Sequence, residues 1–435
     1  MAKSIRIMLA IATWYDYEIW QMNVKTAFLN DFIEEEIYMD QPEGFTVVGE
    51  EQKVCHLQRS IYGLKQASGS WNIHFDEVIG GYDFVKNDFD PCVYKKVSGS
   101  SIAFLVLYVD DILLIGNDVK MLGDTKAWLS TQFSMKNLGE ASYILGIKIF
   151  TDRSKRMLGM TQNSYVEKIL KRFKMEHSKR EFLPMRHRVK LSKKQPPKTN
   201  EDLKRMLDVP YASVVGSIQY AAQCIRLNVA YALSVMNRYQ ACAGEAHWTA
   251  VKTILKYLRR TKDMFLVYGG GELILEGYSD TSFQSDDDDV ISQLGFVFKL
   301  NGDLVAWKSS KQDTTVDSTM EAEYIAASEE AKEAVWMKNY IQELDVVPSI
   351  AEPVVIFCDN NGAIAQVKEP RSHHRSKYIL RRYHLLKEMV ERGDVRMDRV
   401  NSAENIADPL TKPVSQIAYA QHLGKMGLRQ KSDWL

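Results

Sequence analysis

Two adjacent acids, Asp110 and Asp111, lie between two of the most apolar stretches of the chain, in "FLVLYVDDILLIG". Two carboxylates at the tip of a rigid hairpin are costly when they lose water without a partner. A divalent cation removes that cost, and Mg²⁺ prefers oxygen ligands of this kind. In two-metal phosphoryl transfer, one ion activates the attacking hydroxyl and the other stabilises the leaving group. The pair predicts a metal site; the alternative is a surface turn, where acids are also common.

The stretches on either side must hold the acid pair in place. "IAFLVLYV" and "ILLIG" are rich in Leu and β-branched residues and predict two strands of a hairpin. Apolar periodicity predicts helices at "KSIRIMLAIATW" and "DTKAWLSTQFSM", and strands at "EIWQMNVKTAFL" and "ASYILGIKIF". Residues 1–150 are therefore expected to form one mixed segment.

Two further segments and a tail are expected. Residues 151–262 are mostly helical and basic, and "NSYVEKILKRFKM" places an apolar stripe opposite a Lys/Arg face. Within them "KLSKKQPPKTNED" is the best linker candidate. Residues 263–412 return to strands, with a turn at "NG" and a long helix at Thr319–Leu344, which suggests a separate mixed domain. Residues 413–435 are expected to be a C-terminal tail.

The composition is that of an ordinary globular protein, with 45% hydrophobic and 26% charged residues and a formal net charge of zero. The average hides a basic stretch from Asp152 to Lys198, with 15 basic residues against 4 acidic ones. Such segregation can form a basic track on a neutral protein. Among the compensating acids is the run Asp286–Asp289, which is expected to be a solvated loop.

The 5 cysteines are scattered and no pair has CxxC spacing, so neither a zinc site nor a disulfide framework is suggested. No apolar run approaches the ~20 residues of a membrane span, and the N-terminal stretch fits an amphipathic helix better than a signal peptide. The expectation is an intracellular protein, cytoplasmic or nuclear.

Several motifs carry a family resemblance. "YVDDILLIG" resembles the YxDD hairpin of reverse transcriptases, and "QMNVKTAFLN", "EEEIYMDQPEGF", "LQRSIYGLKQAS" and "LGIKI" resemble the Ty1/copia type in order and spacing. The resemblance covers nearly the whole chain. It implies an α+β reverse transcriptase palm with partial fingers and a helical thumb/connection, followed by an α/β ribonuclease H-like domain. The implied activities are RNA-directed DNA synthesis from dNTPs and ribonuclease H hydrolysis, with two Mg²⁺ per active site.

In the palm, the resemblance implies a third metal-binding Asp where this chain has Asn23. A neutral amide cannot bridge two cations as a carboxylate can, so polymerase activity is expected to fall by orders of magnitude. Phe28 matches the aromatic residue beneath the incoming nucleotide's sugar, and Gln66 matches a residue near the nucleotide. Leu145 and Gly146 match the loop that grips the primer end.

In the third segment, the resemblance implies the Asp-Glu-Asp-Asp set of ribonuclease H, whose members bind two Mg²⁺. The matching residues are Asp280, Glu323, Asp359 and Asp408. Taken singly, the aspartates could be strand-end turn residues. Glu321 competes for the glutamate role, but Ser318 three residues earlier gives it a capping-box pattern and a structural task.

The resemblance also implies contacts with an RNA/DNA hybrid or primer-template. The helix "EKILKRFKM" can lay basic side chains along a duplex backbone, and the alternative is a solvated helix face. Those side chains are Lys168, Lys171, Arg172 and Lys174. His373, His374 and His384 lie in another basic segment and are interpreted as hybrid-contacting or surface residues.

Taken together, the expectation is a retrotransposon-derived reverse transcriptase with ribonuclease H, N-terminally truncated and polymerase-defective at Asn23, with the nuclease acids intact. The alternatives are a non-catalytic nucleic-acid-binding relic or a pseudogene product that does not fold. Oligomeric state is left open.

Overall fold

The computed structural model describes residues 2–30, 33, 35–187, 189–368 and 385–434. The chain forms two compact units, one of residues 16–142 and one of residues 2–15 with 143–435. The division differs from the predicted boundary at residue 150, and the N-terminal helix belongs to the second unit. The predictions for His373, His374 and His384 lie outside the described residues. No described helix is both long and apolar enough to cross a membrane.

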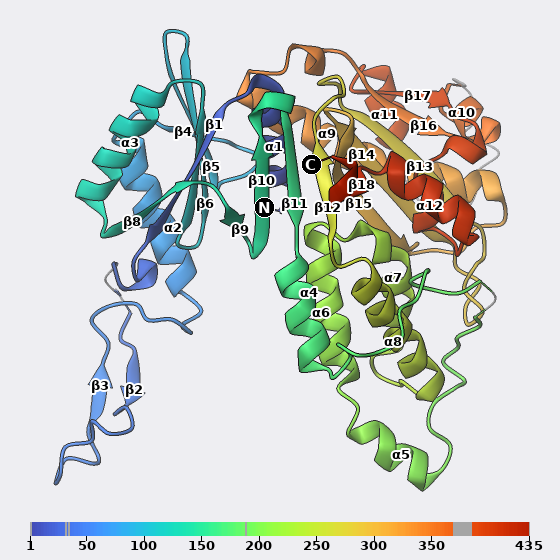
Figure 1. The fold of residues 1–435 in the computed structure, drawn as a ribbon, viewed down its shortest axis with the longest axis horizontal. Coiled ribbons are helices and arrows are strands. Elements are labelled where there is room, and N and C mark those ends of the chain that lie inside the picture. The colour runs from blue at the N-terminus through green and yellow to red at the C-terminus, as the bar shows by residue number, and fades with distance from the viewer. Residues whose placement is uncertain (1, 31–32, 34, 188, 369–384, 435) are drawn as a thin grey trace. The chain divides into compact units, whose positions relative to one another are not determined.

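The first unit is built on a six-stranded sheet in the order β4-β5-β6-β7-β1-β8 (Figure 1). Its strands are β1 (Glu18–Val24), β4 (Val85–Lys86), β5 (Val93–Ser98), β6 (Ser101–Tyr108), β7 (Asp111–Gly116) and β8 (Met135–Glu140). All the pairings in this sheet are antiparallel. The predicted hairpin of the acid pair is confirmed as β6–β7, at the centre of the sheet.

Two helices, α2 (Ala67–Gly80) and α3 (Val119–Gln132), supply the core of this unit. Trp71 and Phe75 of α2 pack with Leu129 of α3 against strand residues of the sheet. Helix α3 begins where the Asp118 side chain accepts hydrogen bonds from the backbone N–H groups of Lys120 and Met121, an N-cap that satisfies otherwise unpaired donors. The helices therefore provide a rigid backing for the central hairpin.

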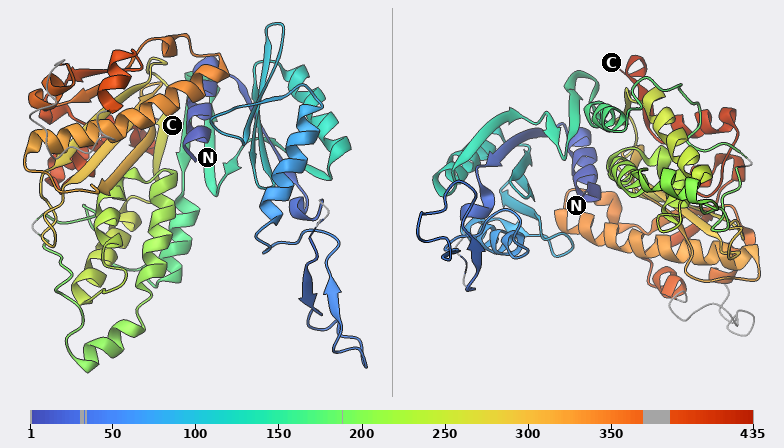
Figure 2. Two further views of the ribbon diagram at one scale, coloured as in Figure 1. Left: turned by 180° about the vertical axis from the view of Figure 1, so that it is seen from behind. Right: turned by 90° about the horizontal axis from the view of Figure 1, so that it is seen from below.

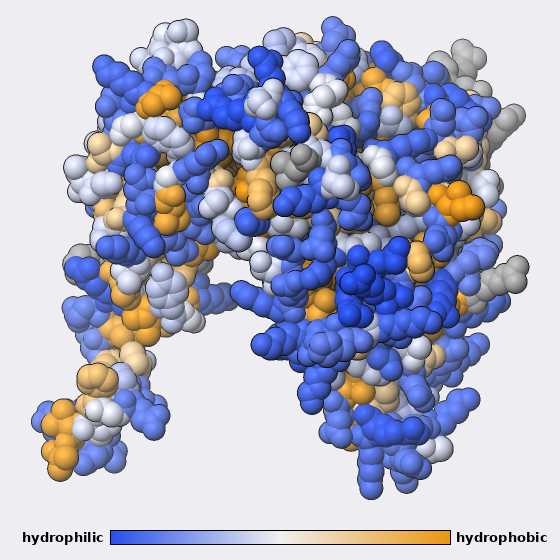
Figure 3. All heavy atoms as spheres, in the orientation of Figure 1, coloured by the Kyte–Doolittle hydropathy of each residue, from blue (hydrophilic) through white to orange (hydrophobic). Residues whose placement is uncertain are grey.

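A two-stranded ribbon, β2 (Tyr38–Asp40) with β3 (Val54–His56), extends from the same unit beyond the short helix η1 (Ala27–Asn30). Figure 3 shows apolar side chains gathered at the far end of this ribbon. Phe45 is 78% exposed and Val48 is 94% exposed. These side chains contribute little to the unit's core.

The second unit contains a five-stranded sheet in the order β18-β12-β11-β10-β9. It is formed by β9 (Tyr143–Ile144), β10 (Ile147–Asp152), β11 (Met157–Thr161), β12 (Met264–Tyr268) and β18 (Leu428–Gln430). The single strand predicted at "ASYILGIKIF" is wrong, because Leu145 and Gly146 have positive φ and turn the chain into the β9–β10 hairpin. The predicted C-terminal tail is wrong too, since β18 pairs with β12 and Trp434 is buried.

A helical layer lies beside this sheet in the second unit (Figure 2). It comprises α4 (Asn163–Arg172), α5 (Asn200–Leu207), α6 (Tyr211–Cys224), η3 (Leu227–Val229), α7 (Ala230–Asn237) and α8 (Glu245–Arg260). Helices α4, α6, α7 and α8 share one apolar core. The mostly helical character predicted for residues 151–262 is confirmed, with β10 and β11 spanning its first residues.

A second five-stranded sheet, in the order β15-β14-β13-β16-β17, follows in the chain. Its strands are β13 (Glu276–Ser282), β14 (Gln293–Leu300), β15 (Asp303–Lys311), β16 (Val354–Cys358) and β17 (Val395–Arg399). Strand β13 pairs parallel with β16 and antiparallel with β14. The long helix α9 (Thr319–Leu344) matches its prediction and packs on β13, β14 and β16.

Smaller elements complete this part of the chain. They are α10 (Asn361–Lys368), α11 (Leu385–Glu391), α12 (Gln416–Lys425) and the short helices η2 (Arg153–Lys155), η4 (Pro348–Ala351), η7 (Ser402–Glu404), η8 (Asp408–Leu410) and η9 (Lys431–Asp433).

Helix α1 (Ala2–Tyr15) is held to the second unit by Arg6. The buried Arg6 guanidinium donates to the backbone oxygens of Val305, Gln223 and Cys224 at 2.6–2.8 Å and lies 4.0 Å from the centre of the Trp307 ring. A buried cation needs several acceptors of this kind to repay lost hydration. The N-terminal helix is thus an integral part of the second unit.

The acidic run at residues 286–289 is not the solvated loop that was predicted. Asp286 is 4% exposed and forms ion pairs with Arg238 at 2.5 Å and Lys311 at 2.9 Å. Asp288 accepts hydrogen bonds from the Ser192 hydroxyl and the Lys193 backbone N–H. The run therefore anchors the predicted linker, because Asp286 and Asp288 bond to protein donors, although Asp287 stays exposed to water.

Candidate active sites

The first candidate site is the β6–β7 hairpin. Tyr108 pairs with Asp111, so Val109 and Asp110 form a two-residue turn. Val109 has φ of 57°, a conformation that is costly for a β-branched residue. The Trp71 indole N–H donates to the Val109 carbonyl at 2.6 Å and helps to hold the turn. The two acids are thus fixed at a constrained tip.

Asn23 lies between the two acids. It is opposite Asp111 in the β1–β7 register, and its Nδ2 lies 3.0 Å from Asp110 Oδ2 and 3.2 Å from Asp111 Oδ1. Gln21 Nε2 donates to the same Asp111 oxygen at 3.3 Å. Ionised carboxylates only accept hydrogen bonds, so each amide must turn its nitrogen toward them. The carboxylates are bridged by a neutral donor at the position where the family resemblance implies a third acid.

The two predicted nucleotide contacts lie elsewhere in the first unit. Phe28 belongs to η1, and its ring packs on Tyr62 with centroids 4.6 Å apart. Gln66 is exposed immediately before α2. Their roles at a nucleotide stay predictions. Leu145 lies in the second unit, where its backbone carbonyl accepts a hydrogen bond from the Tyr220 hydroxyl.

The second candidate site gathers the four acids predicted in the third segment. Asp280 lies near the end of β13, and Asp359 directly follows β16. Because these neighbouring strands run parallel, their carboxyl ends share one edge of the sheet. Glu323 comes from the start of α9, and Asp408 begins η8. Asp280 and Asp359 act electrostatically on Glu323, and Asp359 and Asp408 act on Asp280.

Burial perturbs two of these carboxyls strongly. It is the largest cause that raises the pKa of Asp280 to about 6, against the opposing effects of Lys412 and Thr411. Burial, followed by the charges of Asp280 and Asp359, raises the pKa of Glu323 to about 9. Glu323 is 7% exposed, and its Oε2 has no hydrogen-bond partner among the described residues. A buried acid without a partner, among like charges, is suited to holding a cation.

Lys412 and Thr411 support this cluster and were missed in the sequence. Lys412 Nζ lies 2.5 Å from Asp408 Oδ1, and the Thr411 hydroxyl donates to Asp280 Oδ2. Burial lowers the pKa of Lys412, but Asp280, Asp408 and Asp359 outweigh it and raise the pKa above its usual value. The available signal was their place directly after the late acid in "NIADPLTK".

The structural task predicted for Glu321 is confirmed. Its backbone N–H donates to the Ser318 hydroxyl at 3.2 Å, and its carboxylate accepts from the Asp317 backbone N–H at 3.2 Å. These contacts cap the N-terminus of α9. Glu321 is therefore occupied at the helix start, two residues before Glu323.

The predicted basic face of α4 is present on the surface. Val166, Ile169 and Leu170 are buried in the helical core. The opposite side carries the exposed side chains of Lys168, Lys171 and Arg172, and the exposed Lys174 follows two residues beyond the end of the helix. Figure 3 shows a largely hydrophilic surface over these helices. The arrangement fits a sequence-independent contact with a phosphate backbone.

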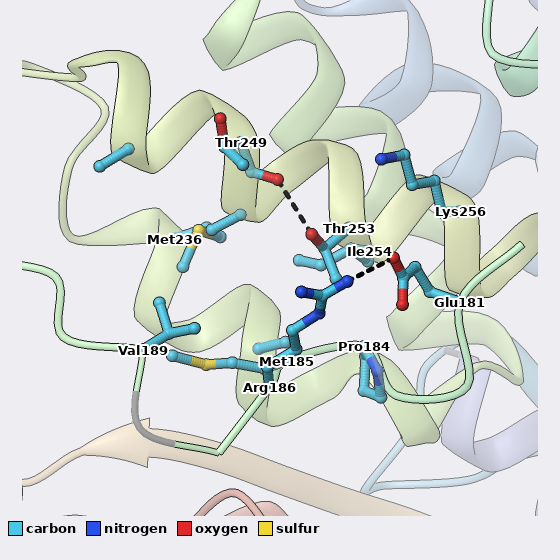
Figure 4. A pocket seen from close by; sticks show the side chains of 13 residues that line it. Glu181, Pro184, Met185, Arg186, Val189, Met236, Thr249, Thr253, Ile254 and Lys256 are labelled. Carbon is cyan, nitrogen blue, oxygen red and sulfur yellow. Dashed lines mark hydrogen bonds and ion pairs between the residues drawn. The ribbon is translucent and has the colours of Figure 1, made fainter. Parts of the chain in front are cut away.

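A cavity of about 200 Å³ lies in the helical layer (Figure 4). Met185, Met236 and Ile254 contribute apolar walls, and Arg186 pairs with Glu181 at 2.8 Å along its lining. None of the predicted acids lines this cavity, so it is separate from the candidate active sites.

A comparison with known protein families agrees with the fold of the first unit and with the acid pair at its hairpin. Residues 1–187 match the family described as reverse transcriptase (RNA-dependent DNA polymerase). Residues 1–187 therefore belong to a reverse transcriptase domain.

The relatives identify the type. The chain is 43% identical to the Retrovirus-related Pol polyprotein from transposon TNT 1-94 of Nicotiana tabacum, over 94% of this chain and 31% of that protein. It is 34% identical to the polyprotein from transposon RE2 of Arabidopsis thaliana, over 98% and 28%. It is 31% identical to the putative transposon Ty5-1 protein of Saccharomyces cerevisiae, over 72% of this chain and all of that protein. The chain belongs to the Ty1/copia-type retrotransposon Pol family.

The chain spans about a third or less of the plant polyproteins that it matches, at 31% and 28% of their lengths. The solved structure of the prototype foamy virus protease–reverse transcriptase aligns with 88% of this chain and 43% of that chain, at 11% identity and a TM-score of 0.23.

Proposed function

We propose that the second acid cluster is a ribonuclease H-type site that hydrolyses the RNA strand of an RNA/DNA hybrid. The observation that carries this proposal is Glu323, a buried carboxyl with an unpartnered oxygen beside Asp280 and Asp359. Together with Asp408, these residues form an oxygen-rich donor set of the kind that Mg²⁺ prefers. The buried unpartnered oxygen and the raised pKa values fit a site that gains a cation in place of protons.

In this proposal, Asp280, Glu323, Asp359 and Asp408 would hold Mg²⁺, which activates water and stabilises the leaving oxygen when bound. The chain's own residues prepare the site. Thr411 orients Asp280 through a hydrogen bond, and Lys412 offsets part of the negative charge. Since Glu323 has a pKa of about 9, ligation must displace its proton, and metal affinity rises with pH.

The test is cleavage of a labelled RNA strand in an RNA/DNA hybrid by the folded full chain with Mg²⁺. We expect cleavage by the parent protein and a loss of at least 100-fold in Asp280→Asn. A folded parent protein without Mg²⁺-dependent cleavage would overturn the proposal. Single-stranded RNA serves as the substrate control, because the proposal requires a hybrid.

For the hairpin site, we propose that Asn23 leaves RNA-directed DNA synthesis strongly impaired. Its amide bridges Asp110 and Asp111 with hydrogen bonds of 3.0 and 3.2 Å, and it adds no negative charge to hold two Mg²⁺. Primer extension on an RNA template should be near background in the parent protein and rise in Asn23→Asp. Equal extension by the two proteins would refute this reading.

A second candidate function is nucleic-acid binding without chemistry, which the exposed basic side chains of α4 favour. Such binding would be sequence-neutral and would weaken steeply with salt. Hybrid binding that persists when Asp280, Glu323, Asp359 and Asp408 are all neutralised, with no turnover by the parent protein, would favour this candidate over the nuclease.

A further inference from the structure

The acid cluster of the second unit contains a thiol that the oxygen-based site does not use. Cys358 is the last residue of β16, and burial alternates along this strand so that Val354, Ile356 and Cys358 share its buried face. Helix α9 packs on β16 and brings Glu323 to the same place. Among the described residues, Glu323, Cys358 and Asp359 are the group whose potential ligand atoms all lie within 4.8 Å of one another.

Each member of this trio has capacity for a ligand. Glu323 Oε2 is buried and has no hydrogen-bond partner among the residues described. The Cys358 sulfur accepts one hydrogen bond, from the Asn360 backbone N–H at 3.4 Å. Asp359 is partly exposed, so the group is reachable from solvent on that side. An unpartnered buried oxygen and a sulfur that accepts a single backbone hydrogen bond are together suited to coordination.

The donor types discriminate between cations. Mg²⁺ takes oxygen ligands and has little affinity for sulfur. Thiolate ligands favour softer ions such as Zn²⁺, and by the same preference Cd²⁺. Three protein ligands and one water is a common Zn²⁺ arrangement, with Zn–S near 2.3 Å and Zn–O near 2.0–2.2 Å. Those bond lengths place the ligand atoms of one ion roughly 3.5 Å apart. The potential ligand atoms of the trio lie within 4.8 Å of one another, so side-chain movements of about 1 Å would bring them to this separation.

We propose that Glu323, Cys358 and Asp359 form a binding site for a thiophilic divalent cation of the Zn²⁺ or Cd²⁺ class. On binding, the Cys358 thiol and the Glu323 carboxyl each release a proton to solvent, and both carboxylates turn to the ion. The cation site depends only on the trio's geometry. Its consequence, inhibition of hydrolysis by withdrawal of Glu323 and Asp359 from Mg²⁺, rests on the proposed nuclease function.

The test is titration of the full chain with Cd²⁺, followed by ultraviolet absorption of the Cd²⁺–thiolate bond. We expect a saturable band in the parent protein, its loss in Cys358→Ser, and its retention in Cys242→Ser, whose thiol lies outside the trio. A Cys358→Ser band equal to that of the parent protein would overturn the proposal.

A second variant covers the case in which Cys358→Ser does not fold. Asp359→Asn changes a partly exposed side chain. It should keep the thiolate band but lower the affinity for Cd²⁺ at least 10-fold. An unchanged affinity would contradict a site formed by these three residues. The two proposals fail separately. If Cd²⁺ binds but the hybrid is not cleaved, the cation-site proposal holds and the nuclease proposal is refuted. If the hybrid is cleaved with Mg²⁺ but no Cys358-dependent band appears, the nuclease proposal holds and the cation-site proposal is refuted.

Discussion

Replacing Asn23 with Asp tests how hydrogen bonds from the Asn23 amide stabilise the β6–β7 hairpin. In the parent protein, the Asn23 amide donates to Asp110 Oδ2 at 3.0 Å and to Asp111 Oδ1 at 3.2 Å. An aspartate at the same position has no donor when ionised, so both hydrogen bonds are lost. Three carboxylates then converge, with Gln21 as the remaining amide donor to Asp111.

The free-energy cost follows from these contacts. Hydrogen bonds to charged groups contribute about 1.5–3 kcal/mol each, and partial exposure of the site favours the lower end. Repulsion between unit charges about 3 Å apart adds about 1.4 kcal/mol in water and more where water is excluded. Protonation of the new carboxyl caps this cost. We expect Asn23→Asp to lower the free energy of unfolding by about 3–5 kcal/mol without Mg²⁺ at neutral pH.

Mg²⁺ should reverse much of this loss in the variant. Three carboxylates form a cation site, and a ligand at 100 times its Kd stabilises the folded state by about 2.7 kcal/mol. The measurement is urea unfolding of the parent protein and the variant, in EDTA and in Mg²⁺. Asn137→Asp is the matched control, because Asn137 is an exposed amide on β8 of the same sheet. Metal binding at the second acid cluster cancels in the comparison, since all three proteins share that cluster.

Two results would refute the reasoning. If Asn23→Asp is as stable as the parent protein in EDTA, the amide bridge contributes nothing. If Mg²⁺ stabilises the parent protein, the control and Asn23→Asp equally, the third carboxylate does not complete a cation site.

Three further predictions follow from other contacts. Burial raises the pKa of Glu330 well above 4.5, so the folded chain keeps a proton that the unfolded chain releases. The free energy of unfolding therefore falls as pH rises above 4.5, by up to about 1.4 kcal/mol per pH unit, and Glu330→Gln should flatten this slope in urea titrations; an unchanged slope would contradict it. Ser318→Ala removes the acceptor for the Glu321 N–H and should cost about 1 kcal/mol, measured by thermal unfolding, and no loss would count against the cap. Lys168→Glu with Lys171→Glu should weaken hybrid binding and reduce its salt slope by about 2, and an unaltered slope would remove α4 from the interface.

Local patterns were enough to predict the elements that carry each site. Two apolar runs meeting at Asp110 predicted the β6–β7 hairpin, and the capping pattern at Ser318 predicted the start of α9. In these places the determining interactions lie within a few residues along the chain. A segment of mixed strands and helices was also predicted for residues 263–412 from the order of its elements, and a mostly helical segment was predicted for residues 151–262.

Long-range contacts explain what the sequence did not reveal. The Asp286 run has the composition of a loop, but Arg238 and Lys311 reach it from elements that are distant in sequence. Helix α1 has the pattern of any amphipathic helix, and the partners of its buried Arg6 lie more than 200 residues away. Likewise Cys358 joins Glu323 only through the packing of α9 on β16.

The bridging amide of Asn23 was predicted in part from the sequence and in part became clear only from the structure. The resemblance identified the position as a missing acid, but a sequence pattern cannot show which way an amide turns. The structure places the Asn23 side-chain nitrogen between two carboxylates. The residue therefore lacks the negative charge of an aspartate, and it also donates hydrogen bonds to Asp110 Oδ2 and Asp111 Oδ1.

In the proposed nuclease, Glu323 serves the four-acid site while Glu321 serves the helix cap. The most direct measurement is Mg²⁺-dependent cleavage of the RNA strand of a hybrid by Glu323→Gln and by Glu321→Gln, two isosteric changes two residues apart. We predict that Glu323→Gln loses at least 100-fold of the parent activity, while Glu321→Gln keeps most of it, because its amide oxygen can still accept from the Asp317 backbone N–H. Equal activity in the two variants, or a greater loss in Glu321→Gln, would contradict the account.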